Sequence, residues 1–287
     1  MVLGTQFYAG PADAMRRQDQ AAGALLQLCG ARLVNVQWVD EVYERPGFET
    51  LAVLRQDSRS VTRLPVRRKP IVPELFDALA AAAVRQGTRY FGFLNADIIV
   101  SQSAIDAVSR EGRDAYAFSR LDVEPGSGRA VSLVLNGLDL FVFDATWWRR
   151  NRRRFRPYIL AEWFYDCVIG ALIACHGNGL ILNRDGEIRH EAHPQPPPGG
   201  LAHYNGYLAA LDAPYFSLWV QYRDRLDMLR EKGASEAEER ALQREAFVWR
   251  PSWRSRVLHL GRQVRARWRY RSGYAEMARE LTNEAAR

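Results

Sequence analysis

The feature that most constrains this chain is the apolar run over residues 89–101, which reads RYFGFLNADIIVS. A strand that is buried in a parallel sheet has a continuous apolar sequence of this kind, not an alternating one. Helical patterns precede and follow the run, so we expect an α/β unit whose strand ends at Asn95 and Asp97. Ligands of open α/β sheets bind at the carboxyl ends of the strands. An amide and a carboxylate at that edge can hold a hard cation and the phosphates that it bridges.

Length and composition are those of a globular protein with one large α/β domain, or with one domain and an appendage. The chain has 287 residues, of which 47% are hydrophobic and 25% are charged. Its three cysteines, Cys29, Cys167 and Cys175, form no Cys-x-x-Cys pair, which argues against a disulfide framework or a zinc site and for a reducing compartment. The first residues carry no basic leader, and the longest apolar run, residues 167–175, is too short to span a bilayer. We therefore expect a cytoplasmic protein.

The net charge of +7 lies in the C-terminal tail, where residues 249–287 hold ten arginines against three glutamates. Apolar side chains recur there at helical spacing, with arginines between them: Trp253, Val257, Leu260, Val264 and Trp268. A basic amphipathic helix of this kind lies on anionic membrane surfaces, so residues 249–271 predict peripheral contact with the inner face of the membrane. A helix that packs on its own domain or on a second subunit explains the pattern equally well.

The other patterns place strands and helices in the order of a nucleotide-binding half-sheet. Further strands are expected over residues 1–8, 32–39, 50–54, 114–119, 131–135, 138–143 and 180–182. Helices are expected over residues 12–29, 72–86, 101–111, 216–232, 235–247 and 253–268. Between two of the strands, Asn136-Gly137 is a strong hairpin signal. The sequence thus predicts a Rossmann-type mixed sheet flanked by helices, with a C-terminal helical appendage.

Four motifs along the chain resemble, in order, those of the nucleotide-sugar-dependent glycosyltransferases of the GT-A fold. They are Asn95-Ala96-Asp97, a variant of the Asp-x-Asp signature, then Gly137-Leu138-Asp139-Leu140-Phe141, Tyr165-Asp166 and a late histidine. The resemblance covers residues 1–205 and implies a GT-A-like catalytic domain over residues 1–213, followed by a helical region over residues 214–287. It implies transfer of a hexose from a nucleotide-diphosphate-sugar to an acceptor hydroxyl, in surface glycan or glycolipid synthesis.

The resemblance also implies a divalent metal, Mn²⁺ or Mg²⁺, held by Asp97 with His190, and with His193 as the next candidate. Donor contacts are implied for residues at strand ends or before a helix, namely Gln6, Tyr8, Asp57, Lys69, Asn95 and Arg120, and for Asp139 inside a strand. From the residues alone, a carboxylate inside an apolar strand is costly unless it is paired or ligating, which favours a function for Asp139. Simpler explanations are core packing for Tyr8, a solvated charge run for Lys69, and capping or packing for the histidines.

Two carboxylates compete for the role of catalytic base. Glu162 and Asp166 are four residues apart, so on a helix they share one face, where like charges destabilise it. Their neighbours are aromatic and apolar, which favours the raised pKa that a general base needs. The resemblance implies Asp166, which follows an aromatic residue as in the family. Glu162 departs from the family pattern, so the choice between the two stays open.

Two further segments have alternative interpretations. Residues 147–156 contain two tryptophans and six arginines. They could meet an anionic partner, but a solvated helix with its tryptophans packed inward is the simpler interpretation. Residues 195–200 are an irregular proline- and glycine-rich segment, which we interpret as a flap over the donor.

Two other classes of function stay open. A sugar-phosphate nucleotidyltransferase shares the α/β half and the metal site, but it usually carries a glycine-rich basic loop after the first strand, which residues 6–10 lack. A non-enzymatic protein that binds a membrane or nucleic acid would rest on the arginines alone, and its binding would fall steeply with salt. Because the carboxylates and aromatic residues cluster away from the tail, we expect no nucleic acid partner.

Overall fold

The structure, a computed structural model, describes residues 1–184, 186–194, 200–248 and 253–285, with the backbone alone at residues 200, 253–256, 275–277 and 280–285. The chain forms two compact units. Unit 1 comprises Met1–Arg55, Pro73–Arg154 and His176–Gln195, and unit 2 comprises Gln56–Val72, Phe155–Cys175 and Pro196–Arg287. The boundary that we predict near residue 213 separates a catalytic from a helical region, and it stays a prediction.

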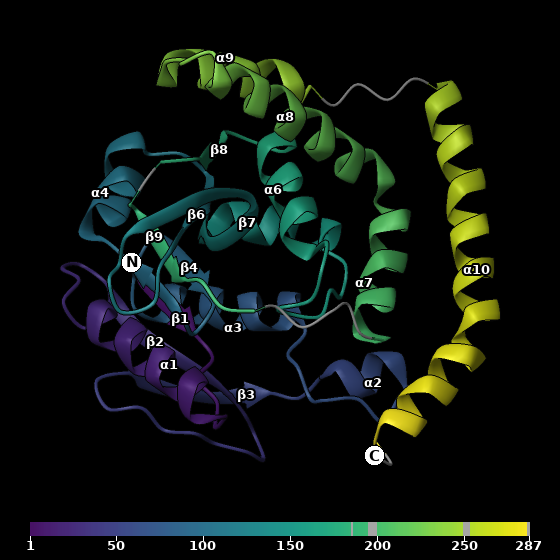
Figure 1. Cartoon of the computed structure of the whole chain (residues 1–287), viewed down its shortest axis with the longest axis horizontal. Helices are drawn as coiled ribbons and strands as arrows, with labels where there is room; N and C mark the ends of the chain where they lie inside the picture. Colours follow the sequence, from purple (N-terminus) through teal and green to yellow (C-terminus); the bar gives the residue numbers. More distant parts are fainter. Residues whose placement is uncertain (185, 195–199, 249–252, 286–287) are drawn as a thin grey trace. The chain divides into compact units, whose positions relative to one another are not determined.

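Unit 1 is built around one mixed sheet (Figure 1). Its strands are β1 (Val2–Thr5), β2 (Arg32–Trp38), β3 (Glu49–Leu54), β4 (Tyr90–Leu94), β5 (Ile98–Val100), β6 (Ala115–Val123), β7 (Ala130–Asp144), β8 (Gly179–Leu182) and β9 (Ile188–Glu191). Their order is β3-β2-β1-β4-β7-β6-β9-β5, and β8 pairs with β6. The first four strands are parallel, whereas β7 runs antiparallel to both β4 and β6. The predicted α/β class with a mixed sheet is confirmed.

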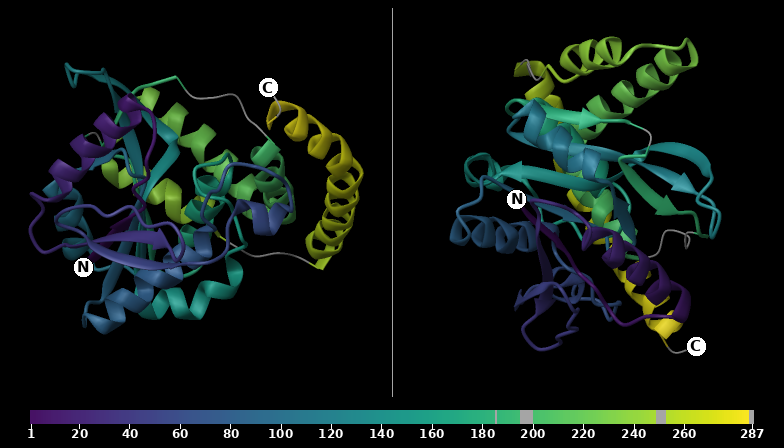
Figure 2. Two further views of the ribbon diagram at one scale, coloured as in Figure 1. Left: turned by 90° about the horizontal axis from the view of Figure 1, so that it is seen from below. Right: turned by 90° about the vertical axis from the view of Figure 1, so that its left-hand side faces the viewer.

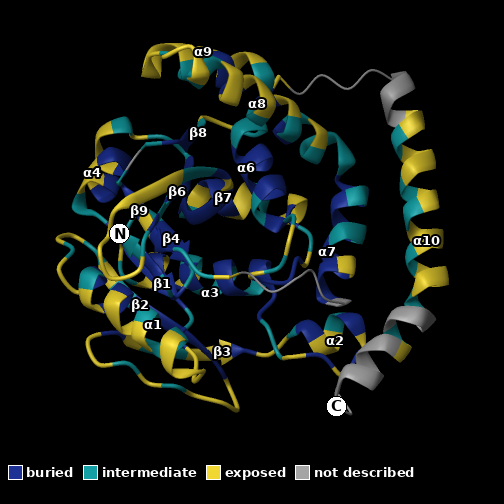
Figure 3. Ribbon diagram, viewed as in Figure 1, coloured by how far each residue is buried: buried dark blue, intermediate teal, exposed yellow. Residues whose placement is uncertain are grey.

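Both faces of this sheet are covered by helices of unit 1, because its central strands carry apolar residues on both sides. On one face the aromatic residues of β4 and β7 contact Phe76 of α3 (Val72–Arg85) and Trp148 of α5 (Ala145–Asn151). The alternate residues, such as Leu94 and Leu140, share a core with α1 (Ala12–Leu25) and α4 (Gln102–Glu111). Figure 3 shows buried residues along β1, β4 and α3.

β7 is one continuous strand, so the predicted hairpin at Asn136-Gly137 is wrong. The ladder between β6 and β7 is irregular here, because Ser119 pairs with Leu138 whereas Arg120 pairs with Val134. The extra residues of β7 form a bulge, and glycine is common at such positions. An added Cβ at Gly137 would lie 3.1 Å from Nε of Arg120. The glycine therefore makes room for a functional candidate instead of closing a turn.

The arginine-rich segment over residues 147–156 begins in a helix whose tryptophans pack inward. Trp147 and Trp148 of α5 are buried, whereas Arg149 is exposed. Nε1 of Trp148 donates to Asp77 at 2.9 Å, which fixes the helix to α3. A 3₁₀ turn over Arg152–Arg154 completes the segment. The predicted solvated helix with inward tryptophans is confirmed.

Unit 2 is mainly helical. Its helices are α2 (Ser58–Thr62), α6 (Tyr165–Cys175), α7 (Gly200–Leu211), α8 (Ala213–Glu231), α9 (Glu236–Ala246) and α10 (Trp253–Ala285). α8 and α9 lie side by side (Figure 2), and α9 begins with a capping box between Ser235 and Glu238. None of the described helices combines the length and the apolar character needed to cross a membrane. The predicted flap lies outside the described residues, apart from the backbone of Gly200.

Candidate functional site

The strand-end pair Asn95 and Asp97 lies in unit 1, directly after β4 and before β5. β5 pairs antiparallel with β9, and this ladder sets Ile98 opposite His190. The register therefore brings His190 next to Asp97, although the two residues are far apart in the chain. His193 follows the end of β9.

Within the described part of the chain, one group of candidate metal ligands converges: Asp97, His190 and His193, whose ligand atoms all lie within 4.8 Å of one another. Oδ2 of Asp97 lies 3.7 Å from Nε2 of each histidine. One carboxylate oxygen and two imidazole nitrogens suit a transition-metal ion such as Mn²⁺ better than Mg²⁺, which prefers oxygen ligands. The chemistry of these donors therefore fits a divalent metal.

Asp122 of β6 fixes the orientation of His190. Its Oδ1 lies 3.0 Å from Nδ1 of His190, so Nε2 faces Asp97. The parallel ladder between β6 and β9 sets Asp122 opposite His190, so the sheet itself makes this contact. Metal-binding histidines are commonly held by a carboxylate in this way. The sequence pattern points to Arg120 of this strand, whereas Asp122, two residues further on the same face, is not among the predicted site residues.

The charges of this group shift two pKa values. Burial alone would lower the pKa of His190, but the hydrogen bond to Asp122 and the nearby Asp97 carboxylate outweigh it and raise this pKa to about 9. Burial disfavours the Asp97 carboxylate, yet the imidazoles of His190 and His193, each 3.7 Å away, hold the pKa of Asp97 well below its usual range. At neutral pH, the deprotonated Asp97 carboxylate of the metal-free site therefore faces the protonated imidazole of His190. A metal ion that binds here must displace that proton.

A chain of hydrogen bonds links Asn95 to the same site. Nδ2 of Asn95 donates to Oδ1 of Asp139 at 2.7 Å, and Nη1 of Arg120 donates to Oδ2 of Asp139 at 2.8 Å. Nε of Arg120 in turn donates to Oδ1 of Asp122 at 2.9 Å. Asp139 is only 5% exposed, and these two partners compensate its buried charge. Three predicted donor residues therefore belong to one network with the metal group.

The first predicted donor edge follows β1. Phe7 is buried against the ring of Phe48, whereas Tyr8 is 38% exposed and Gln6 is half-buried. Two buried polar residues of β2 hold this edge in place: Oδ1 of Asn35 accepts from the Phe7 N–H at 3.2 Å, and Nε2 of Gln37 donates to the Phe7 carbonyl at 2.8 Å. Neither residue is among the predicted site residues, although polar residues inside an apolar strand are a usable signal.

α1 anchors the segment between the two histidines. Arg16 of α1 binds the carboxylate of Glu191 through both terminal nitrogens, with Nη1 2.9 Å from Oε2. The Glu191 side chain is 8% exposed, so the carboxylate of this ion pair is largely shielded from solvent. The pairing joins residues from the two ends of unit 1, and no local pattern in the sequence predicts it.

Asp57 and Lys69 belong to unit 2, where each has a structural partner. Asp57 caps α2 by accepting from the Ser60 N–H at 2.8 Å, and it pairs with Arg68 at 3.1 Å. Nζ of Lys69 lies 2.7 Å from Oε1 of Glu162. Arg68 and Lys69, which precede α3, are thus each paired with a carboxylate of this unit.

The segment before α6 is irregular, so the predicted helical face shared by Glu162 and Asp166 is wrong. α6 begins at Tyr165, which puts Asp166 in its first turn and leaves Glu162 outside the helix. Ala161 and Phe164 have φ angles of 53° and 79°. This left-handed conformation costs a residue other than glycine about 1–3 kcal/mol.

Tertiary hydrogen bonds keep residues 158–164 from continuing the helix. Asn205 of α7 pairs with the N–H and the carbonyl of Ile159, each at 2.9 Å. Nζ of Lys69 donates to the carbonyl of Ala161 at 3.1 Å. Asn205 and Ile159 are both 0% exposed, so their bonds form without competing water. Strained backbone that its surroundings hold in place in this way is a mark of functional segments.

No known family profile and no curated protein matches this chain. Among solved structures, S. aureus TarS 1–349 with UDP-GlcNAc is similar at 11% identity and a TM-score of 0.48, over 95% of this chain and 91% of that chain. The same protein with UDP matches at 11% identity and a TM-score of 0.45. A protein from Desulfovibrio desulfuricans G20, described as a nucleotide-diphospho-sugar transferase, matches at 13% identity and a TM-score of 0.29, over 50% of this chain and 63% of that chain.

Proposed function

We propose that this chain is a metal-dependent glycosyltransferase of the GT-A type, which moves a sugar from a nucleotide-diphosphate-sugar to an acceptor hydroxyl in surface glycan or glycolipid synthesis. The observation that carries the proposal is the convergence of Asp97, His190 and His193, with His190 oriented by Asp122. Asp97 follows β4, and nucleotide ligands of α/β sheets bind at the carboxyl ends of such strands. We assign residues 1–213 to catalysis and residues 214–287 to the helical region.

Asp97, His190 and His193 would hold the metal, and we expect Mn²⁺ before Mg²⁺ because two of the three ligands are nitrogens. A bound divalent ion neutralises charge on the diphosphate leaving group. Asp122 keeps Nε2 of His190 directed at the ion site. Asn95, two residues before Asp97, would contact the ribose of the donor or a water on the metal.

Asp166 would accept the proton of the acceptor hydroxyl if transfer proceeds with inversion. Glu162 is the weaker candidate, because its Oε1 already pairs with Lys69 at 2.7 Å. Asp166 lies in the first turn of α6, directly after the aromatic Tyr165. As the acceptor oxygen bonds to the sugar, its proton passes to Asp166 and the nucleoside diphosphate leaves.

We propose further that the protein is cytoplasmic and contacts the inner face of the membrane through α10. Val257, Val264 and Trp268 of this helix are 57%, 65% and 68% exposed. Arg267 and Arg271 are exposed close to them. Exposed apolar side chains bordered by arginines are typical of helices that lie on anionic lipid surfaces.

Calorimetric titration with UDP and GDP, with and without Mn²⁺, tests the transferase proposal. We expect one nucleotide to bind only in the presence of the metal. Asp97→Asn should weaken that binding at least about tenfold, because it removes the negative charge of the carboxylate that would hold the metal. Asp106→Asn is the matched control, since Asp106 is an exposed aspartate of α4, and it should bind the nucleotide as the wild type does.

Two results would overturn the proposal: no nucleotide binding under any condition, or equal binding by the wild type and Asp97→Asn. Release of free sugar from the matching nucleotide-sugar, followed over hours without acceptor, gives an independent readout of transfer to water. Release of pyrophosphate from a nucleoside triphosphate and a sugar phosphate would identify a nucleotidyltransferase instead.

A further inference from the structure

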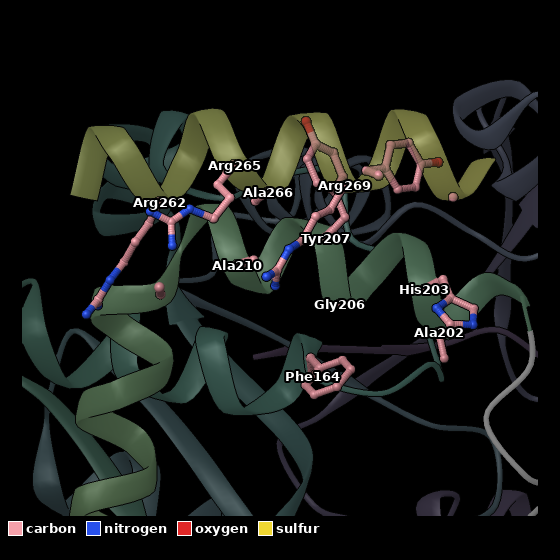
Figure 4. Close-up of a pocket in the computed structure, with 13 residues that line it drawn as sticks. Phe164, Ala202, His203, Gly206, Tyr207, Ala210, Arg262, Arg265, Ala266 and Arg269 are labelled. Carbon is pink, nitrogen blue, oxygen red and sulfur yellow. The ribbon is translucent and has the colours of Figure 1, made fainter. Parts of the chain in front are cut away.

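A pocket of about 820 Å³ lies within unit 2, between α7 and α10 (Figure 4). Arg262, Arg265 and Arg269 of α10 line one side of it. Their spacing of three and four residues puts them on one face of the helix. Figure 4 shows Arg262 and Arg269 extending from α10 toward α7. The pocket therefore presents several guanidinium groups to one space.

The described residues that line this pocket give it a positive charge. Among the described residues that line it, none is Asp or Glu. Elsewhere in the unit, arginines are paired, as Arg156 is with Asp212 and Arg230 is with Glu239. No ion pair joins the three pocket arginines to a carboxylate in the part of the chain that the structure describes. Grouped guanidinium groups attract an anion, and their planar fork matches a phosphate.

The rest of the lining is aromatic and apolar. Tyr207 of α7 stacks on Tyr270 of α10, with the ring centroids 4.4 Å apart and an interplanar angle of 14°. Phe164 lines the pocket as well. Ring surfaces beside a cluster of cations suit a phosphate that is carried on an organic group, because the rings can bury its apolar side.

Phe164 ties this pocket to the segment of the proposed base. It lies two residues from Glu162 and two residues from Asp166. Its φ of 79° is one of the strained angles of that segment. Gly206 of α7 leaves room for the ring, since an added Cβ would lie 3.4 Å from it. The pocket wall and the base segment are therefore parts of one constrained stretch.

We propose that this pocket binds a phosphate ester carried by the acceptor, with the arginines on the phosphate and the aromatic rings on the attached sugar or lipid. The inference rests on the proposed glycosyl transfer, because it takes Asp166 as the group that receives the acceptor proton. It adds the chemical class of the acceptor, which the residues around Asp97 do not indicate.

Calorimetric binding to the full chain in EDTA tests the inference with three probes: glucose 6-phosphate, monomeric dihexanoyl phosphatidic acid, and glucose as the phosphate-free control. EDTA removes metal-dependent binding at the donor site. We expect a phosphate-bearing probe to bind and glucose not to bind. Tighter binding of the sugar phosphate identifies a glycan-borne phosphate, and tighter binding of the lipid identifies a lipid-borne one. Binding of neither probe overturns the inference.

The double variant Arg262→Glu/Arg269→Glu reverses two charges in the pocket. Arg149→Glu/Arg150→Glu is the matched control, because it makes the same charge change at two exposed arginines of the basic helix α5, outside the pocket. All four arginines are exposed, so both variants should fold. We expect the Kd of the preferred probe to rise at least about tenfold in the pocket variant and less than about twofold in the control. Equal losses in the two variants would show general attraction to a basic helix and overturn the pocket.

Gly206→Leu narrows the pocket beside Phe164 without a change of charge. It should also weaken binding of the phosphate probe about tenfold. Gly23→Leu is its control, because Gly23 of α1 faces open space. Metal-dependent nucleotide binding should be unchanged in all these variants. If the wild type binds no nucleotide yet binds the phosphate probe through Arg262 and Arg269, the transferase proposal fails and the anion site stands. If it binds nucleotide but no phosphate probe, only the inference about the acceptor fails.

Discussion

At the scale of single residues, the candidate metal site depends on a histidine held between two carboxylates. His190 is 3% exposed, and burial lowers its pKa, but Asp122 and Asp97 raise that pKa to about 9. An unfolded histidine titrates near 6.5. Because the folded pKa is the higher one, the pairing stabilises the metal-free protein fully below about pH 6.5. This stability is lost as the pH rises through about 9.

His190→Gln should therefore lower the free energy of unfolding of the metal-free protein by on the order of 3 kcal/mol more at pH 6 than at pH 10. Urea unfolding in EDTA at the two pH values measures the difference. His203→Gln is the control, because His203 is exposed on α7 and should leave the free energy near that of the wild type. A deficit in His190→Gln that does not change with pH would show that the imidazole contributes by packing instead of charge.

The same residues show what the sequence could predict about the site. Asn95 and Asp97 end a long apolar run, so their position at a strand edge follows from a local pattern. Asp122 could not be chosen in advance, because its contact with His190 depends on β6 lying next to β9 in the sheet. A resemblance of ordered motifs predicts candidate ligands, whereas the partners that orient them come from strand order.

At the scale of elements, the segment before α6 depends on one buried amide. Asn205 binds both backbone groups of Ile159, and both residues are 0% exposed. Asn205→Ala leaves a buried N–H and a buried carbonyl unpaired, so we expect the free energy of unfolding to fall by about 3 kcal/mol. Chemical denaturation measures this loss. Asn151→Ala is the comparison, because Asn151 donates within its own helix at a half-buried site and should cost less than about 1 kcal/mol. Equal losses would mean that the amide does not hold this segment.

This segment and β7 are where local patterns predict the wrong element. The helical spacing of Glu162 and Asp166 is present in the sequence, but hydrogen bonds from Asn205 and Lys69 fix the backbone before α6 in another conformation. In β7, pairing with β6 along most of its length outweighs the turn preference of Asn136-Gly137. α9 lies close to its predicted bounds, whereas α1 begins where predicted but ends at Leu25, four residues before its predicted end.

At the scale of the whole molecule, α10 carries both the excess of arginines and a row of exposed apolar side chains. The sequence leaves open whether this helix packs on its own domain or lies on a membrane. The structure shows that it packs on α7, through Tyr270 and through Gln263, whose Nε2 donates to the Leu211 carbonyl at 3.1 Å. This contact uses a different face from the apolar stripe, since Val264 and Trp268 remain 65% and 68% exposed. Packing and membrane contact are therefore compatible, which the periodicity alone does not reveal.

Sedimentation with vesicles tests the proposed membrane contact. We expect binding to vesicles of phosphatidylcholine with 30% phosphatidylglycerol, and much weaker binding to phosphatidylcholine alone, since the arginines need anionic lipid. Val264→Asp should weaken this binding at least about tenfold, because it sets a carboxylate where the helix would enter the interface. Val84→Asp is the matched control, because Val84 of α3 is 70% exposed but lies outside the basic tail.

Salt separates the two contributions to this binding. Charge attraction is screened as ionic strength rises, whereas burial of apolar side chains persists. The wild type should therefore keep part of its binding at high salt, and Val264→Asp should lose that part while retaining some attraction at low salt. Arg267→Glu/Arg271→Glu should show the reverse, with its loss largest at low salt. If Val84→Asp weakens binding as much as Val264→Asp does, or if the salt profiles of the two α10 variants coincide, the apolar stripe has no specific role and α10 acts only as a basic helix.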